Sequence, residues 1–293
     1  MYQRRAGAGF HHGLLESAVM ARKHTMRRRG ADRRRLYELA VQDTAFEVTL
    51  AKRQFRRRRG RRARLLREDF CGTAAVACAW AADHAEHRAI GLDIDESALA
   101  WGREHHLAAL GDAADRVDLR VRDVRTVTQP RADIVQAYNF SAYLFYPLPE
   151  LVAYLRCVRR SLVPGGLVML DGYGGWEAGQ DVSDRRTIQS PDGSFGYVWE
   201  QASFNPIDNL ATCHIHFEFR NGKVWKRAFS YHWRVYSPAE LTDALLAAGF
   251  EHVEILWDVD DDPDRSDFRP ATRAENCPGW LFYAVAEAPS PGG

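Results

Sequence analysis

The chain has 293 residues, of which 46% are hydrophobic and 27% charged, and its 40 basic and 39 acidic side chains nearly balance. This length suffices for one large α/β domain or two small ones. No apolar run approaches the ~20 residues of a transmembrane helix and no apolar signal region is present, so we expect a cytoplasmic protein without a membrane partner. The five cysteines form no CxxC pair, which indicates reduced thiols and excludes a disulfide framework or a zinc site.

Charge is distributed unevenly along the chain. Residues 1–67 contain 20 basic and five acidic side chains, whereas the remainder contains 20 basic and 34 acidic ones. A basic segment on an acidic body is typical either of a protein that binds a polyanion or of an arginine-rich surface that docks on the body itself. We favour docking, because no aromatic or glycine residues are interleaved with the arginines as they are in nucleic-acid readout.

The N-terminal region divides into two parts. Residues 1–30 carry glycine, histidine and arginine clusters without hydrophobic periodicity, which predicts a basic, largely disordered segment. In residues 32–59 apolar side chains recur at roughly helical spacing, which predicts two short helices with Asp32 as the N-cap of the first.

Short apolar strands then alternate with helices up to residue 175. Strands are predicted from residue 65 and at 90–94, 117–124, 133–139 and 167–171, with helices at 74–84, 96–110 and 148–162. This alternation predicts a parallel sheet with right-handed crossovers.

The first of these strands leads into a junction that is typical of ligand binding. The strand ends in Glu68 and is followed by the turn Phe70-Cys71-Gly72-Thr73-Ala74 and an alanine-rich helix. Such a junction points backbone N–H groups and the positive end of a helix at a ligand. Asp93 ends the second strand, 21 residues past Gly72, where a carboxylate can accept hydrogen bonds from ribose hydroxyls, and Asp123 ends the third.

With these residues the chain resembles the class I S-adenosylmethionine (SAM)-dependent methyltransferases, whose first motif is acid-x-Gly-x-Gly-x-Gly. Glu68 and Gly72 match the acid and the middle glycine, whereas Phe70 and Ala74 replace the other two glycines. A Pro-Gly-Gly break at residues 164–166, before the fifth strand, also recurs in that family. The resemblance covers residues 65–175 and implies a three-layer Rossmann-like α/β sandwich with a mostly parallel seven-strand sheet, and SAM as the cofactor.

The resemblance also implies which residues bind SAM. The first loop holds the methionine end, the acid after the second strand holds the ribose, and the acid after the third strand holds the adenine together with the next backbone N–H. The predicted cofactor-binding residues are Tyr37, Glu68, Phe70, Gly72, Asp93, Asp123, Val124 and Asn139. The alternatives are a helix N-cap for Asp93, a turn acid for Asp123 and an Asx-turn for Asn139.

From residue 172 the pattern changes to antiparallel strands, predicted at 196–200, 211–220 and 223–236, with Asn221-Gly222 as a hairpin signal. The alternation gives this sheet one apolar face and one polar, histidine-containing face. A helix from Ser237 to Gly249 and strands at 253–257 and 280–286 complete the chain. The acidic stretch 258–267 lacks EF-hand spacing, so we interpret it as a solvated loop and not as a calcium site.

We predict that the antiparallel sheet covers the substrate. The catalytic candidates are Asn139, beside the transferable methyl group in the family, and Tyr173 and His214. A neutral histidine suits a hydroxyl acceptor, which needs a general base, whereas an amine acceptor needs only the loss of its own proton. His214 and His216 are two residues apart on one strand and are the alternative metal ligands, but we predict no metal.

These observations predict a basic segment, residues 1–30, and a single methyltransferase domain, residues 31–293. The domain comprises a helical cover (31–64), a SAM-binding core (65–175), an antiparallel insertion (176–236) and a C-terminal helix with the last strands (237–293). The predicted activity is methyl transfer from SAM to a nitrogen or oxygen of a small molecule. The alternatives are an RNA or protein methyltransferase guided by the arginine-rich N-terminus, and a non-catalytic scaffold with a degenerate cofactor loop. A nicotinamide-dependent oxidoreductase is disfavoured, because the Gly-x-Gly-x-x-Gly turn is absent.

Overall fold

The computed structural model describes residues 32–259 and 266–290, and the predicted basic segment 1–30 lies outside this range. Two helices open the described chain, α1 (Arg33–Val41) and α2 (Thr44–Arg59), as the sequence predicts. Asp32 caps α1 by accepting hydrogen bonds from the N–H groups of Arg34 and Arg35. None of the described helices is long and apolar enough to cross a membrane.

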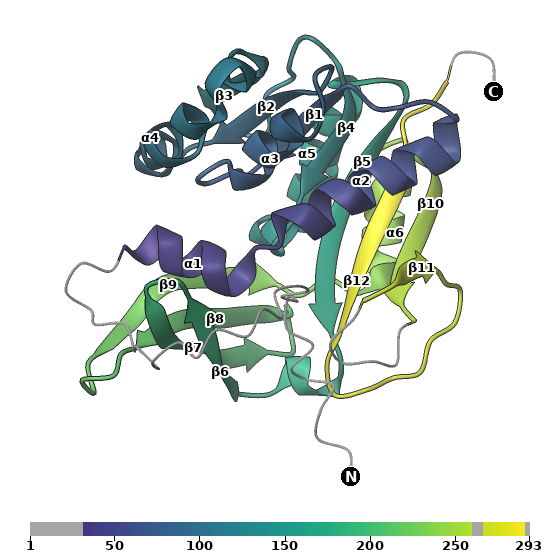
Figure 1. Ribbon diagram of the computed structural model, residues 1–293. Coiled ribbons are helices and arrows are strands. Elements are labelled where there is room, and N and C mark those ends of the chain that lie inside the picture. The colour runs from purple at the N-terminus through teal and green to yellow at the C-terminus, as the bar shows by residue number, and fades with distance from the viewer. Residues whose placement is uncertain (1–31, 260–265, 291–293) are drawn as a thin grey trace.

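The central sheet contains five parallel strands and three that join it by antiparallel pairing. The parallel strands are β1 (Leu65–Asp69), β2 (Arg88–Asp93), β3 (Val117–Val121), β4 (Ala132–Ala137) and β5 (Leu162–Gly174). Antiparallel pairing joins β10 (Glu251–Asp258), β11 (Phe268–Pro270) and β12 (Trp280–Glu287) to the sheet, and β10 runs in the direction of β5 because both pair antiparallel with β12. Their order is β11-β10-β12-β5-β4-β1-β2-β3, which puts the order reversal between β1 and β4 (Figure 1). The sheet therefore has eight strands and not the predicted seven, because three residues after the acidic loop pair with the edge strand β10.

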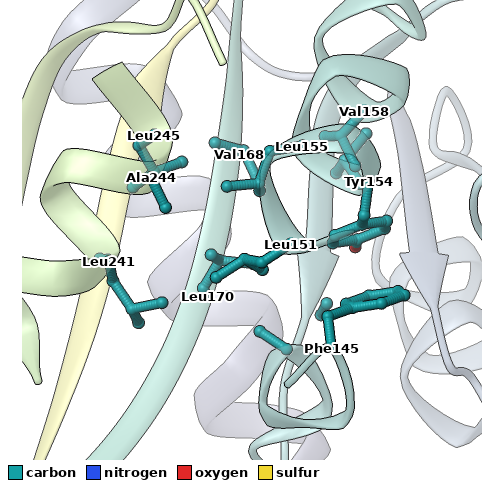
Figure 2. Packing of buried hydrophobic residues seen from close by; sticks show 14 of the residues in the cluster. Phe145, Leu151, Tyr154, Leu155, Val158, Val168, Leu170, Leu241, Ala244 and Leu245 are labelled. Atoms are coloured by element: carbon teal, nitrogen blue, oxygen red, sulfur yellow. The ribbon is translucent and has the colours of Figure 1, made fainter. Parts of the chain in front are cut away.

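Helices cover both faces of this sheet and complete the predicted three layers. One face carries α2, α3 (Ala75–Asp83), α4 (Glu96–His105) and the 3₁₀ segment η1 (Leu107–Arg116), and the other carries α5 (Leu148–Arg160) and α6 (Pro238–Ala247). Figure 2 shows the second face, where Leu151 and Leu155 of α5 and Leu241 and Leu245 of α6 pack around Val168 and Leu170 of β5. All six side chains are fully buried. This packing holds β5 in place, and Asp171 of β5 lies near the carboxyl edge of the sheet.

The insertion forms a second sheet of four antiparallel strands in chain order. They are β6 (Val182–Ser190), β7 (Gly193–Asn205), β8 (Leu210–Glu218) and β9 (Val224–Arg234). Two short 3₁₀ segments lie outside this sheet: η2 (Ser141–Leu144) follows β4, and η3 (Trp176–Gly179) precedes β6. β6 was not predicted, because Val182 and Ile188 are its only aliphatic side chains. The apolar face of this sheet packs on α1, so α1 lies between the two sheets (Figure 1). This apolar face, which is rich in aromatic side chains, is therefore turned toward the interior of the molecule.

The arginine-rich stretch of α2 docks on the acidic body. Arg58, whose side chain is 5% exposed, pairs with Glu254 at 2.7 Å, and Arg57 also contacts Glu254. Just past the helix, Arg61 pairs with Asp133 at 2.7 Å. The predicted docking is thus confirmed for the described part of the basic region, where these cations are occupied by the protein's own carboxylates.

Helix α4 approaches the turn after β1 so closely that it needs a glycine. A methyl group on Gly102 would overlap the backbone carbonyl of Thr73, and backbone cannot yield as a flexible side chain can. This contact holds the turn between α4 and the sheet.

We expect Gly102→Ala to lower the free energy of unfolding by about 1–3 kcal/mol, the cost of overpacking, although alanine is the better helix former. Urea denaturation measures the effect. Gly179→Ala is the control, since the added methyl would lie 3.7 Å from Phe204, an ordinary contact. A stabilised Gly102→Ala protein would contradict the close approach.

Candidate active site

The turn after β1 keeps a glycine-like backbone although two of its three expected glycines are absent. Phe70, Gly72 and Ala74 all have left-handed φ angles, of 56°, 53° and 59°. The Phe70 ring packs at 5.8 Å from the ring of Phe145 and 6.0 Å from that of Tyr154, on the α5 side of the sheet. A Cβ atom on Gly72 would meet nothing within 4 Å, so the turn is open at this residue. The replacements thus preserve the loop conformation that the motif requires.

Two strand-ending acids hold this turn and the helix after it. Asp93 accepts a 2.7 Å hydrogen bond from the N–H of Gly72 through Oδ2, and its Oδ1 accepts from the N–H of Asp95. Glu68 accepts a 2.8 Å bond from the N–H of Ala77 in the first turn of α3. Burial is the main cause that raises the pKa of Glu68 to about 8, and the nearby Asp93 carboxylate adds to it. The structure therefore brings Glu68, Gly72 and Asp93 together as predicted.

Asp123 and Val124 lie where β3 leads into the next loop. Asp123 pairs with Arg125 at 2.6 Å, and this hydrogen-bonded partner is the main cause that holds its pKa below the ordinary value. Val124 is buried, and its backbone carbonyl accepts a 2.6 Å bond from Arg67. The Asp123 carboxylate is thus ionised at neutral pH and fixed at the end of its strand.

A buried ion pair that was not predicted as part of the site connects these two loops. Arg67 and Asp69 of β1 are fully buried and pair through bonds of 2.6 and 3.0 Å. Arg67 also donates to the carbonyls of Val124 and Thr126, and Tyr154 donates to Asp69 at 2.8 Å. The only sequence signal was the presence of opposite charges inside a buried strand. The pair ties the adenine-side loop to β1.

A second unpredicted acid holds the turn after β4. Asp171 of β5 accepts 2.8 Å bonds from the N–H groups of both Asn139 and Phe140, which have left-handed φ angles of 57° and 59°. Burial is the main cause that raises the pKa of Asp171 to about 7. The sequence signal was an acid at the end of the fifth strand. Asp171 thereby fixes the position of Asn139, one of the predicted catalytic candidates.

Five aromatic side chains, which we call the aromatic wall, cover this turn. They come from the core and from the inner face of the insertion: Phe140, Tyr173, Trp199, Tyr231 and Trp233. The Trp233 ring centroid lies 4.5 Å from that of Tyr231, 5.6 Å from that of Trp199 and 5.6 Å from that of Phe140. The Trp233 indole nitrogen is buried and makes no hydrogen bond.

Two predicted residues, Tyr37 and Tyr173, contact the insertion from this side. The Tyr37 hydroxyl of α1 interacts with that of Tyr231, and the Tyr37 ring lies 5.0 Å from the ring of Phe229. Tyr173 donates its hydroxyl to Gln201 at 3.2 Å. Burial raises the pKa of the Tyr173 hydroxyl well above its ordinary value. Tyr173 therefore remains a neutral hydrogen-bond donor and is unsuited to act as a base.

The structure does not bring His214 together with Asn139 and Tyr173. Cys213 lies 3.9 Å from the Tyr173 hydroxyl, and successive strand residues point to opposite faces, so His214 faces away from the wall. It bonds to Ser230 at 2.8 Å, and on the same face His216 bonds to Glu200 at 2.8 Å. The polar face was expected to contact substrate, but burial of the aromatic face against α1 and the core turns it outward. Within the described ranges, no three metal-ligating side chains are arranged to hold a metal ion.

A parallel sheet with a left-handed loop after its first strand and an acid after its second is the architecture that the sequence resemblance implied. Residues 71–168 match the family model of a methyltransferase domain. Residues 71–168 are thus similar to a methyltransferase domain, in agreement with the resemblance to class I SAM-dependent methyltransferases drawn from the sequence. A comparison with curated proteins found no match.

Solved structures share this fold over most of the chain. CalS10 of Micromonospora echinaspora, an amino pentose methyltransferase, has a TM-score of 0.63 and 17% identity, covering 86% of this chain and 95% of its own. KedS8 of Streptoalloteichus sp., a sugar N-methyltransferase, has a TM-score of 0.63 and 17% identity over 96% and 100%. The CcbJ methyltransferase of Streptomyces caelestis has a TM-score of 0.61 and 22% identity over 83% and 94%. At these identities the likeness establishes the fold.

Proposed function

We propose that the protein transfers the methyl group of SAM to an amino nitrogen of a small molecule, with an amino sugar as the favoured acceptor class. The observation that carries the proposal is the aromatic wall over the Asn139 turn, since a wall of this kind encloses a small acceptor. Two structural neighbours that are described as an amino pentose methyltransferase and a sugar N-methyltransferase support the choice.

The residues of the first loop fit the methyl donor. Gly72 has open space beside it, and the Asp93 carboxylate adjoins it to receive ribose hydroxyls. Asp123 with the Val124 N–H would hold the adenine. The remaining proposed contacts, toward the methionine end, are Tyr37, Glu68, Phe70 and Asn139.

When bound, SAM supplies an electrophilic methyl group that an in-line nucleophile displaces from sulfur. The chain's contribution is to position the acceptor and to exclude water from the site. Asp171 fixes the Asn139 turn through two backbone bonds, so the Asn139 side chain is held where it can orient the acceptor nitrogen. Gln201 of the insertion accepts a hydrogen bond from the Tyr173 hydroxyl and thereby fixes its position.

An amine acceptor agrees better with this site than a hydroxyl acceptor. A hydroxyl must lose its proton to a general base during the reaction, whereas an amine attacks through its lone pair and arrives as the free base. The histidines of the insertion, which suit that base, lie on the outer face, and Tyr173 holds its proton. RNA or protein acceptors are less favoured, because Arg57, Arg58 and Arg59 at the end of α2 are paired with carboxylates of the body.

The donor part of the proposal predicts micromolar binding of S-adenosylhomocysteine, measured by calorimetry. We expect Asp93→Ala to weaken binding at least about tenfold, the worth of roughly one charge-assisted hydrogen bond. Asp118→Ala is the matched control, since this exposed acid on the neighbouring strand pairs only with Arg120. Absence of binding by the wild type would favour the non-catalytic scaffold.

The acceptor part predicts methyl transfer to amines. Mass spectrometry with an isotope-labelled methyl donor should detect transfer to members of an amino-sugar panel. We expect transfer to the sugar with a hydroxyl at the same position to be at least about 100-fold slower, the smallest usual effect of a missing general base. Equal rates for both members of a pair would refute the amine specificity.

One variant in the aromatic wall should affect the use of the acceptor, whereas one variant on the outer, histidine-containing face of the insertion should not. We expect Trp199→Ala to raise the acceptor KM at least about fivefold, because ~1 kcal/mol of aromatic contact is lost, and to leave S-adenosylhomocysteine affinity unchanged. His214→Ala, on the outer face, should leave kcat and its pH profile unaltered. A loss of kcat in His214→Ala that excess base in the medium restores would make the histidine a catalytic residue.

A further inference from the structure

Behind the first loop, on the side of the sheet covered by α2 and α3, lies a group of buried polar side chains that none of the roles above explains. Glu47 of α2 is 3% exposed and Tyr138, at the end of β4, is 7% exposed. Glu47 lies close to Glu68 and Asp171, Tyr138 lies close to Glu47 and Asp171, and the Tyr138 ring lies 5.2 Å from that of Tyr283. We call these five residues the buried carboxylate cluster.

The cluster contains three carboxyl groups, and among the residues that the structure describes no cation acts strongly on any of them. The charged groups that act most strongly on Glu47 are Glu68 from β1, Asp171 from β5 and Asp43 from the turn before its own helix, all of them acids. Only the backbone N–H of Asp43 offsets them. Tyr138 and Tyr283 face Glu47 from β4 and β12, and both are neutral phenols. A buried carboxyl group either pairs with a cation or holds a proton, so a ligand that brings a positive group can replace the protons of this cluster.

The Tyr138 hydroxyl points independently to a ligand. Its oxygen is buried and has no hydrogen-bond partner, although buried hydroxyls rarely remain unpaired. After burial, the groups that act most strongly on it are Glu47 and Asp171, so it is directed into the cluster. An ammonium group, with three N–H donors, would satisfy the phenol oxygen and two carboxylate oxygens together.

We propose that Glu47 and Tyr138 form the site that binds the α-ammonium group of the methionyl part of SAM. This inference rests on the proposed function. Glu68 links the cluster to the first loop, because the acid of that loop also holds the start of α3. The proposed acceptor site lies on the other side of the turn, because Phe140 belongs to the aromatic wall and contacts Trp233, whereas Tyr138 contacts Tyr283. The donor's amine and the acceptor's amine thus have separate sites.

This arrangement couples ligand binding to proton release. Burial raises the pKa of Glu47 well above its ordinary value and that of Glu68 to about 8, so the ligand-free cluster holds protons at neutral pH. An ammonium group beside these carboxyls favours their ionised form and lowers their pKa. Binding at pH 7 therefore releases protons, and affinity rises as the pH is raised toward about 8.

The test is calorimetric titration of the full-length protein in buffers of different ionisation enthalpy, with two probes. S-adenosylhomocysteine carries the ammonium group, whereas 5′-methylthioadenosine lacks the whole amino-acid part. We expect the wild type to release protons on binding the first probe and none on binding the second. Glu47→Gln should weaken the affinity for S-adenosylhomocysteine at least about tenfold and reduce the proton release on its binding. The affinity for 5′-methylthioadenosine should remain unchanged.

Tyr138→Phe should also weaken S-adenosylhomocysteine selectively, by severalfold, since it removes one hydroxyl from the same site. Thr49→Ala, at an exposed position of α2, is the control and should change the affinity for neither probe. Equal proton release by both probes, or equal loss of both in Glu47→Gln, would overturn the proposed ammonium site. If the wild type binds neither probe, the proposed function itself fails.

Discussion

Strand-ending carboxylates that accept backbone N–H groups hold the carboxyl edge of the central sheet together. Glu68 binds the start of α3, Asp93 binds the first loop, and Asp171 binds the turn after β4. Each carboxyl oxygen satisfies a backbone N–H that would otherwise lack a partner, so each acid restricts a segment that would otherwise be free to move. The aromatic wall and the proposed cofactor contacts all depend on these restricted loops.

This solution places like charges close together in a dry environment. Burial raises the pKa of both Glu68 and Asp171, and the protein accepts that cost at its most enclosed edge. Elsewhere the same chain neutralises a buried acid within its own structure, as Arg67 does for Asp69. The contrast is informative, because Arg67 is a structural counter-ion at one end of β1, whereas the neighbouring cluster is suited to a cation that arrives with a ligand.

Much of the fold follows from local pattern. The βα alternation and the acids at residues 68, 93 and 123 were predictable, because strand ends of a parallel sheet share one edge. β6 and the edge strand β11 were not, since their polar side chains carry no hydrophobic period and only pairing with a neighbour makes them strands. The alternation along β8 correctly predicted which residues share a face. It could not predict which of the two faces is turned toward the site, because that depends on packing against α1 and the pattern of a single strand holds no information on it. Glu47 escaped prediction for the same reason, because only the packing of α2 against the sheet shows that this acid is buried together with Leu50 and Ala51.

The strained first loop bears on the choice between an enzyme and a scaffold. Left-handed conformations at Phe70 and Ala74 cost of order 1 kcal/mol each, and a chain without a ligand at this turn gains nothing from holding them. Here the Phe70 ring is anchored between Phe145 and Tyr154, and a glycine at residue 102 lets α4 press against the same turn. The surrounding structure thus maintains, with other residues, the backbone that glycines would adopt freely. Preservation of that shape, with Gly72 open and Asp93 beside it, favours a loop that still binds its ligand.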